Sequence, residues 1–190
     1  MKNVFIHLAG ALLIAASAPA SANFVGAYDV SNWTTTLPGD PAGGGGSMNL
    51  SDAPSSITMQ GGDAGPCHDN PNCAVNFTIR AVNTGTVSFT WDYISYDDDG
   101  SKYDWFGFLK NGLFTPLSEN SVWIREQSGY EIFDISAGDI FGFSLNCHDC
   151  EFFPANTTIS NFTVVPEPAS FALVGLGIVG LAVGRRKQAN

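Results

Sequence analysis

Residues 75–93 read VNFTIRAVNTGTVSFTWDY, and this stretch decides the fold class. Apolar residues alternate with polar ones over residues 75–80 and again over residues 87–93. A period of two residues is typical of a strand that buries one face. The stretch therefore predicts two strands, and the aromatic side chains of the second are expected to face the core. These side chains are Phe89, Trp91 and Tyr93.

Similar strand patterns flank this stretch, and nothing in the sequence predicts a helix in the same region. Asn111-Gly112 and Gln127-Ser128-Gly129 predict hairpin turns, because glycine and asparagine accept positive φ. The pattern indicates an all-β body, an antiparallel β-sandwich or jelly-roll-like fold. The other strands are expected at residues 56–60, 104–110, 113–117, 121–126, 130–135, 140–145 and 157–165.

The charge of the chain is strongly negative and unevenly distributed. The 190 residues carry a formal net charge of −10, and residues 23–165 contain only four basic residues against 17 acidic ones. A nucleic-acid-binding protein needs a basic face for phosphate groups, so the composition argues against that class. An acidic body of this kind stays soluble and attracts divalent cations.

The amino terminus has the parts of a secretory signal peptide, predicted over residues 1–22. Lys2 precedes an apolar run at residues 4–16, and Ala20-Ser21-Ala22 is a small-residue cleavage site. We expect export and cleavage after Ala22. The alternative, an uncleaved anchor, is less favoured because the apolar run is short for a membrane span.

The carboxyl terminus, residues 166–190, has three parts in a fixed order. Pro166-Glu167-Pro168 precedes an uncharged run at residues 169–184, and Arg185-Arg186-Lys187 follows. The 16-residue run would extend about 24 Å as a helix, and a basic cluster after it favours a cytoplasmic end. This pattern predicts a transmembrane helix that stops transfer. The body between the signals, residues 23–165, divides into a loop-rich part (23–73) and a strand-rich core (74–165).

The tail closely resembles the PEP-CTERM sorting signal of Gram-negative bacteria. The resemblance implies recognition by an exosortase, a membrane protease with a cysteine nucleophile, and removal of the tail near Pro166-Glu167-Pro168. It also implies a transient stay in the inner membrane, a final place at the cell surface or in the extracellular matrix, and a link to exopolysaccharide and biofilm. The strand-rich core is similar to the β-sandwich bodies of other proteins with this tail, which implies a fold and no activity.

Four cysteines lie in the exported body, at positions 67, 73, 147 and 150. An even number in an oxidising compartment predicts disulfides. We favour the local pairs Cys67–Cys73 and Cys147–Cys150, and the crossed pairings remain open. The repeated tripeptides Cys67-His68-Asp69 and Cys147-His148-Asp149 offer a metal site as an alternative. A redox role for the Cys147–Cys150 spacing is a weaker alternative, because the motif ends a strand.

The densest run of acidic residues predicts a calcium-binding site, and calcium is the one cofactor that the sequence suggests. Asp97, Asp99 and Asp104 could supply closely spaced oxygen ligands. The spacing is not that of an EF-hand, because the twelfth position would be Phe106. The alternative is a solvated hairpin tip.

These features together predict an exported surface or matrix protein that is not an enzyme and associates with exopolysaccharide. The alternatives are a secreted carbohydrate-active hydrolase, a calcium-dependent carbohydrate-binding module, and a coat or adhesin subunit that associates through strand edges. No motif singles out a catalytic pair. Aromatic side chains could line a saccharide groove, and the candidates are Trp33, Tyr96, Tyr103, Trp105 and Trp123.

Overall fold

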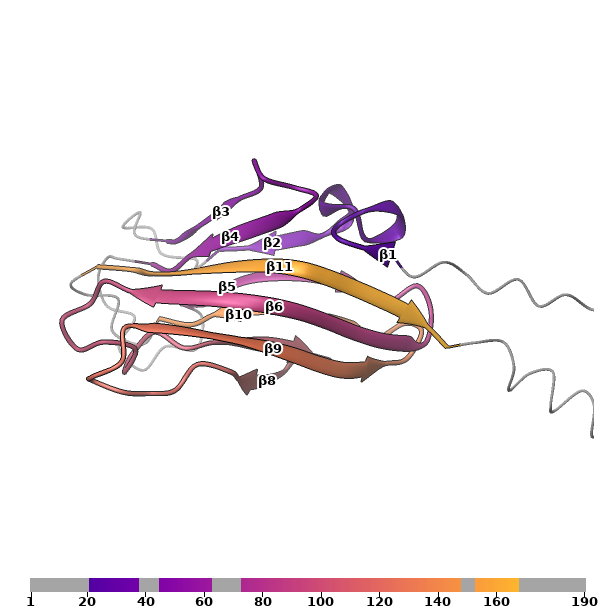
Figure 1. Ribbon diagram of the computed structural model, residues 1–190. Coiled ribbons are helices and arrows are strands. Elements are labelled where there is room, and N and C mark those ends of the chain that lie inside the picture. Colours follow the sequence, from indigo (N-terminus) through magenta and orange to yellow (C-terminus); the bar gives the residue numbers. More distant parts are fainter. Residues whose placement is uncertain (1–20, 38–44, 63–72, 148–152, 168–190) are drawn as a thin grey trace, which may run out of the picture. The chain divides into compact units, whose positions relative to one another are not determined.

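The structure, a computed structural model, describes residues 21–37, 45–62, 73–147 and 153–167 (Figure 1). In this part of the chain eleven strands and two short 3₁₀ helices are formed, and no α-helix. Their bounds are β1 Ser21–Ala22, η1 Gly26–Tyr28, η2 Val30–Asn32, β2 Thr34–Thr36, β3 Ser47–Asn49, β4 Ser56–Gln60, β5 Val75–Arg80, β6 Gly85–Ser95, β7 Phe106–Lys110, β8 Leu113–Pro116, β9 Glu126–Ile135, β10 Ile140–Leu145 and β11 Ala155–Pro166.

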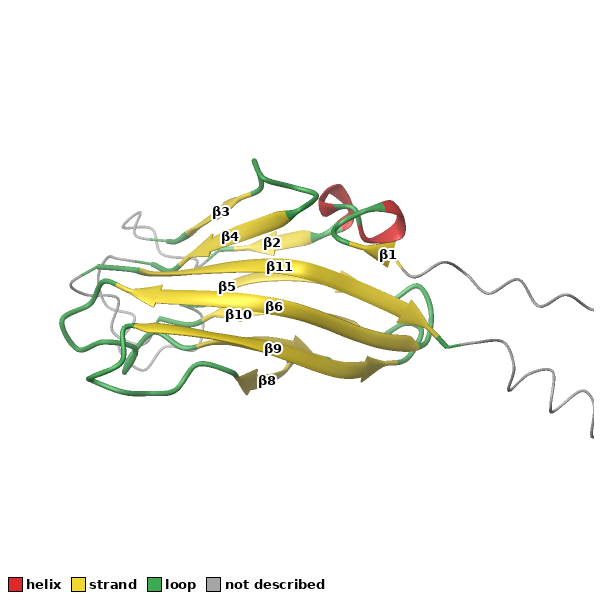
Figure 2. Ribbon diagram, in the orientation of Figure 1, coloured by secondary structure: helices red, strands yellow, loops and turns green. Residues whose placement is uncertain are grey.

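The strands form two antiparallel sheets that face each other, as Figure 2 shows. One sheet has the order β3-β4-β11-β6-β9, with β1 also paired to β11, and we call it the outer sheet. The other has the order β2-β5-β10-β7-β8. The predicted all-β sandwich is therefore confirmed. The strands of the two sheets run in about the same direction, as in an aligned sandwich.

The period-two pattern of the sequence gives the core. On β6 the odd-numbered side chains, including the three predicted aromatics, are buried between the sheets, and the even-numbered ones point outward. The β7–β8 hairpin has Asn111 at φ 52° and Gly112 at φ 80°. Two successive positive φ values define the tight hairpin turn that Asn-Gly favours, so this prediction is also confirmed.

The predicted hairpin at Gln127-Ser128-Gly129 is wrong, because these residues lie inside the continuous strand β9. Gly129 is needed there for packing. A β-carbon at this position would come within 2.8 Å of the Trp91 indole nitrogen, so the ring of Trp91 covers the glycine directly. The strand expected at residues 121–126 is also wrong, since residues 121–125 form a loop before β9.

The segment before β5 supplies an aromatic centre to the core. Trp33 stacks on Phe77 with ring centroids 4.8 Å apart and on Phe143 at 5.6 Å. Phe24 stacks on Phe162 at 4.7 Å and meets Trp33 edge-on. Residues from β5, β10 and β11 thus pack around a tryptophan that belongs to a short loop. The loop-rich segment before β5 therefore contributes to the packing of the core between the two sheets.

A turn at the end of β9 gives a prediction for the pH dependence of stability. The Asp139 carboxylate accepts hydrogen bonds from the Asn111 side chain (2.9 Å) and the Ser136 backbone N–H (2.8 Å), and Lys110 lies 3.8 Å away. These two hydrogen bonds hold the pKa of Asp139 below its usual 3.8, and the bond from Asn111 contributes more than the bond from Ser136. A lowered pKa stabilises the fold above pH 3.8, and this contribution disappears as the pH falls through the lowered value.

We therefore expect Asp139→Asn to be less stable than the wild type at neutral pH, with the difference shrinking below pH 3.8. Urea unfolding of both proteins across this pH range measures it. A difference that stays constant down to the acid limit would contradict the role of the charge.

Candidate functional site

The outer sheet presents a polar face to solvent. Outward side chains on its strands alternate with the buried ones, and nearly all carry hydroxyl, amide or carboxyl groups. On the three strands β11, β6 and β9 they are Asn156, Thr158, Ser160, Thr163, Val165, Thr86, Ser88, Thr90, Asp92, Ile94, Glu126, Ser128, Tyr130, Ile132 and Asp134.

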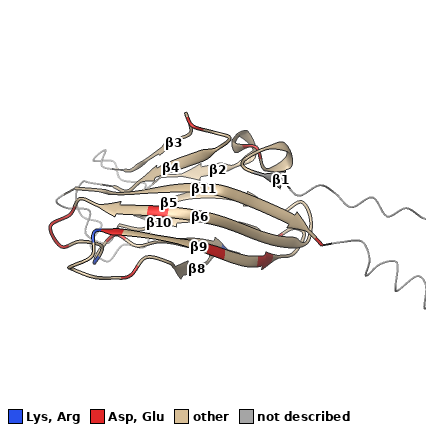
Figure 3. Ribbon diagram, viewed as in Figure 1, with Lys and Arg blue, Asp and Glu red and all other residues tan. Residues whose placement is uncertain are grey.

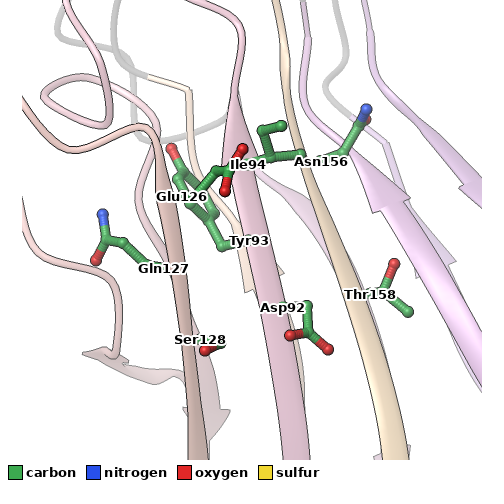
Figure 4. A pocket seen from close by; sticks show the side chains of 8 residues that line it. All are labelled: Asp92, Tyr93, Ile94, Glu126, Gln127, Ser128, Asn156 and Thr158. Atoms are coloured by element: carbon green, nitrogen blue, oxygen red, sulfur yellow. The ribbon is translucent and has the colours of Figure 1, made fainter.

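A shallow groove of about 490 Å³ lies on this face, near the end where β6 stops and β9 begins. Figure 4 shows its lining side chains on three neighbouring strands. The register explains their convergence, because Asp92 lies opposite both Thr158 and Ser128. Two residues further along β6, Ile94 lies opposite Asn156 on β11 and Glu126 on β9. Each strand therefore adds one polar side chain to a row that crosses the sheet.

The row continues beyond the groove. The Thr58 hydroxyl on β4 lies 3.1 Å from the Thr158 hydroxyl, so the two share a hydrogen bond. Asn49 on β3 lies opposite Thr58. Five strands thus place polar side chains side by side at the strand spacing of about 4.8 Å.

The groove has an acidic character. Its lining includes Asp92 and Glu126 and no lysine, arginine or histidine. The basic residues within the described ranges are outside this lining, although Arg125 directly precedes Glu126 at the start of β9 (Figure 3). Arg80 donates to the Gly138 carbonyl, Lys110 pairs with Asp139, Arg125 pairs with Asp98, and Lys102 lies over the Tyr103 ring.

None of the aromatic side chains predicted to line a saccharide groove lines this one. Trp33 is in the core, which corrects its assignment to a surface groove. Trp123 is 89% exposed in the loop before β9, and Tyr96 is also exposed. Tyr103 and Trp105 are partly buried.

The aromatic residue in the groove lining is Tyr93. Sequence reasoning also missed Tyr130, an exposed aromatic side chain on the same face that lies outside the lining. Tyr130 is 62% exposed and lies two residues from Ser128, on the same face of β9. The alternation of residues 126–134 could have placed it there. The mistaken turn at residues 127–129 interrupted that pattern.

The three aspartates predicted as calcium ligands differ in their exposure, and calcium binding stays a prediction. Asp97 is only 2% and Asp104 only 3% exposed, whereas Asp99 is exposed. Asp97 Oδ1 accepts a hydrogen bond from the backbone N–H of Asp99 at 2.7 Å, so this carboxylate stabilises the turn of its own loop. Among the described residues, no three His, Cys, Asp or Glu side chains are grouped so that they could hold a metal ion.

Tyr93 anchors this acidic loop to the sandwich. Its hydroxyl donates to the Asp104 backbone carbonyl at 2.6 Å. Burial, and secondarily the negative charge of Asp104, raises the pKa of Tyr93 well above its usual 10. The hydroxyl therefore stays protonated and remains a donor at any physiological pH.

Two of the four cysteines can be placed. Cys73 and Cys147 are buried together next to the core, and neither is a free thiol. Cys67, Cys150 and both histidines of the repeated tripeptides lie outside the described residues, so the pairing stays a prediction. Because the described cysteines are not free thiols, the structure offers no support for thiolate metal ligands.

A second hollow of about 520 Å³ lies between β7, β8 and β9, and it is lined by Phe108, Lys110, Asn111, Leu113, Thr115, Phe133 and Asp134. Phe108 and Phe133 stack at its floor with centroids 4.3 Å apart. Lys110 reaches across it to donate to the Asp134 carbonyl at 2.6 Å. The Asn111 side chain in this hollow is also engaged, because it bonds Asp139 and the Ile140 N–H.

The beginning of the predicted sorting signal is part of the fold. Pro166 is the last residue of β11, and the Glu167 N–H donates to the Thr84 carbonyl at 3.0 Å. Pro168, Arg185, Arg186, Lys187, the predicted span 169–184 and the signal peptide before residue 21 lie outside the described residues. Among the residues that are described, no helix has the length and apolar character of a membrane span.

Several solved structures show a remote similarity to this chain. The secreted serine protease VesC from Vibrio cholerae is 10% identical with a TM-score of 0.43, over 72% of this chain and 26% of its own. The CBM35 module of Abf62 from Cellvibrio japonicus is 21% identical with a TM-score of 0.31, over 50% of this chain and 67% of its own. The family 35 carbohydrate-binding module from Clostridium thermocellum is 8% identical with a TM-score of 0.31, over 78% of this chain and 99% of its own.

The present chain thus spans about a quarter of the protease's length. The identities are too low for the function of any of these proteins to be carried over. No curated protein matches the chain.

The carboxyl-terminal signal is identified directly. The family model of the PEP-CTERM protein-sorting motif matches residues 164–187, which contain the Pro-Glu-Pro sequence, the uncharged run and the basic cluster. This match confirms the resemblance seen in the sequence. The chain therefore carries a PEP-CTERM protein-sorting motif after an all-β body, and this motif indicates an exported, transiently membrane-anchored protein that is processed by an exosortase.

Proposed function

We propose that this protein is a non-catalytic surface or matrix component that binds an uncharged extracellular polysaccharide along the outer sheet. The observation that carries the proposal is the open groove across β11, β6 and β9, lined by carboxyl, amide and hydroxyl groups. The amide and hydroxyl groups can both donate and accept hydrogen bonds, and the carboxylates accept them, so that together they match the hydroxyls of a sugar chain.

The shape of the groove supports a polymer rather than a small ligand. Sites for small molecules are usually enclosed and mostly apolar. This groove is shallow and continues as a polar row onto β4 and β3. A chain lying across the strands would meet one polar side chain at each strand, and Tyr130 offers an exposed ring next to the row.

The charge of the groove supports an uncharged polymer. Asp92 and Glu126 would repel an acidic polysaccharide, and the groove contains no basic side chain to attract one. Hydrogen bonds from hydroxyl groups to carboxylates are stronger than those to neutral acceptors. Neutral sugar hydroxyls are therefore suitable partners for both carboxylates.

The openness of the groove also supports binding without catalysis. Glycosidases use two carboxyl groups that flank the scissile bond from opposite sides. Asp92 and Glu126 come from neighbouring strands of one flat sheet and project from the same face. That arrangement favours contact with one side of a sugar chain.

The test is retention of the host-processed protein on immobilised polysaccharide. We expect retention on the producer's own polysaccharide or on a neutral glucan, and none on polygalacturonate. Asn156→Ala combined with Ser128→Ala removes two hydrogen-bonding groups on either side of β6. At about 0.5–1.5 kcal/mol per bond, the affinity should fall about tenfold.

Ser88→Ala combined with Thr163→Ala is the matched control, because both residues share the same face but lie outside the groove lining. Equal weakening by both double variants would contradict the assignment of the site. Release of reducing ends during the incubation, abolished by Asp92→Asn, would instead identify a hydrolase.

A further inference from the structure

The sorting motif and the last strand of the sandwich overlap in sequence. The motif begins at residue 164, whereas β11 continues to Pro166. Val164 pairs with Val87, Val165 with Thr86 and Pro166 with Gly85. The Glu167 N–H then bonds to the Thr84 carbonyl. No linker therefore separates the folded body from the motif.

The end of β11 is held in place from several sides. Val164 is only 2% exposed and belongs to the main core cluster. On the neighbouring strand, a β-carbon at Gly85 would overlap the carbonyl oxygen of Val165, so only glycine allows this close approach. Residues 164–166 are thus paired with β6, the Glu167 N–H is bonded to the turn before it, and the side chain of Val164 is buried in the core.

This arrangement restricts where a protease can act. Proteases cut most readily in exposed, unpaired segments, and a paired strand must first detach from its neighbour. Detaching residues 164–167 would expose Val164 and break the pairing with β6. A protease that meets the folded body can reach only the chain beyond it.

We propose that the folded sandwich sets the upstream limit of processing, so that the exosortase cuts a peptide bond after Glu167. In this reaction one C–N bond breaks. The acyl group passes to the protease's nucleophile and then to water or an amine, and the departing tail takes up a proton at its new amino terminus. The mature protein keeps the whole of β11 together with Glu167.

Intact mass spectrometry of the protein processed in its native host tests the proposal. We expect every mature product to contain Glu167. A mature product that ends at Pro166 or earlier would overturn the proposal, whatever polysaccharide the protein binds.

Variants that loosen the end of β11 test whether the fold, rather than the sequence preference of the protease, sets the upstream limit of processing. Gly85→Ala pushes against Val165 and should add products that end at residues 164, 165 or 166. Gly61→Ala is the matched control, because its β-carbon would make only ordinary contacts of 3.6–3.7 Å.

Val164→Thr is the second variant, and it keeps the shape of the side chain while weakening its burial. Hydrogen exchange at residues 163–167 verifies that the strand end has loosened. If the loosened variants still give the single wild-type product, the fold is not the limit.

Discussion

Replacing Trp33 with alanine is expected to lower the free energy of unfolding by about 3–5 kcal/mol. The indole is buried and contacts five aromatic rings, two of them in stacked geometry. Those rings come from the amino-terminal segment and from β5, β10 and β11. Removing the indole would leave a cavity at the point where both sheets meet, and stacked rings are too rigid to fill it.

Trp123→Ala is the matched control, since this tryptophan is 89% exposed and its loss should leave stability nearly unchanged. Urea unfolding followed by circular dichroism compares the two variants with the wild type. Equal stability of the Trp33 and Trp123 variants would show that the amino-terminal segment does not contribute to the core.

Replacing Gly142 with alanine should destabilise the protein by about 3 kcal/mol or more. Gly142 lies in the middle of β10, where a β-carbon would overlap the backbone carbonyl of Phe77 on β5. The carbonyl cannot move aside without disturbing the pairing of β5 and β10, which is central to the sheet β2-β5-β10-β7-β8. Relief of the overlap therefore requires a shift of a whole strand.

The comparison is again with Gly61→Ala, a change of the same size that meets only ordinary contacts. The yield of soluble protein and the urea midpoint distinguish the two variants. A Gly142 variant as stable as the Gly61 variant would mean that the two strands tolerate a wider separation than the structure has.

The strands themselves could be predicted because they depend on local pattern. The alternation in residues 75–80, 87–93 and 140–145 predicted β5, β6 and β10 closely. Asn111-Gly112 predicted a hairpin because its backbone preference does not depend on distant residues. Gly129 gave a false hairpin prediction because its role is to make room for Trp91, nearly forty positions earlier in the chain.

The candidate groove could not be predicted for a related reason. Its residues come from three strands that are far apart in sequence, and only the register of β11 with β6 and of β6 with β9 brings them together. A shift of one residue in either pairing would turn the polar row of one strand toward the core. Such pairings are chosen by the packing of the whole core.

The all-β class, most of the strands and the sorting motif follow from the amino-acid sequence alone. Strand patterns and hairpin turns are local properties, and a sorting signal is recognised through the linear order of its parts. The outer groove, the burial of Trp33 and the pairing of residues 164–167 with β6 and the turn before it arise only in the folded protein. Long-range strand pairing depends on complementary packing between distant segments, which no local stretch of sequence contains.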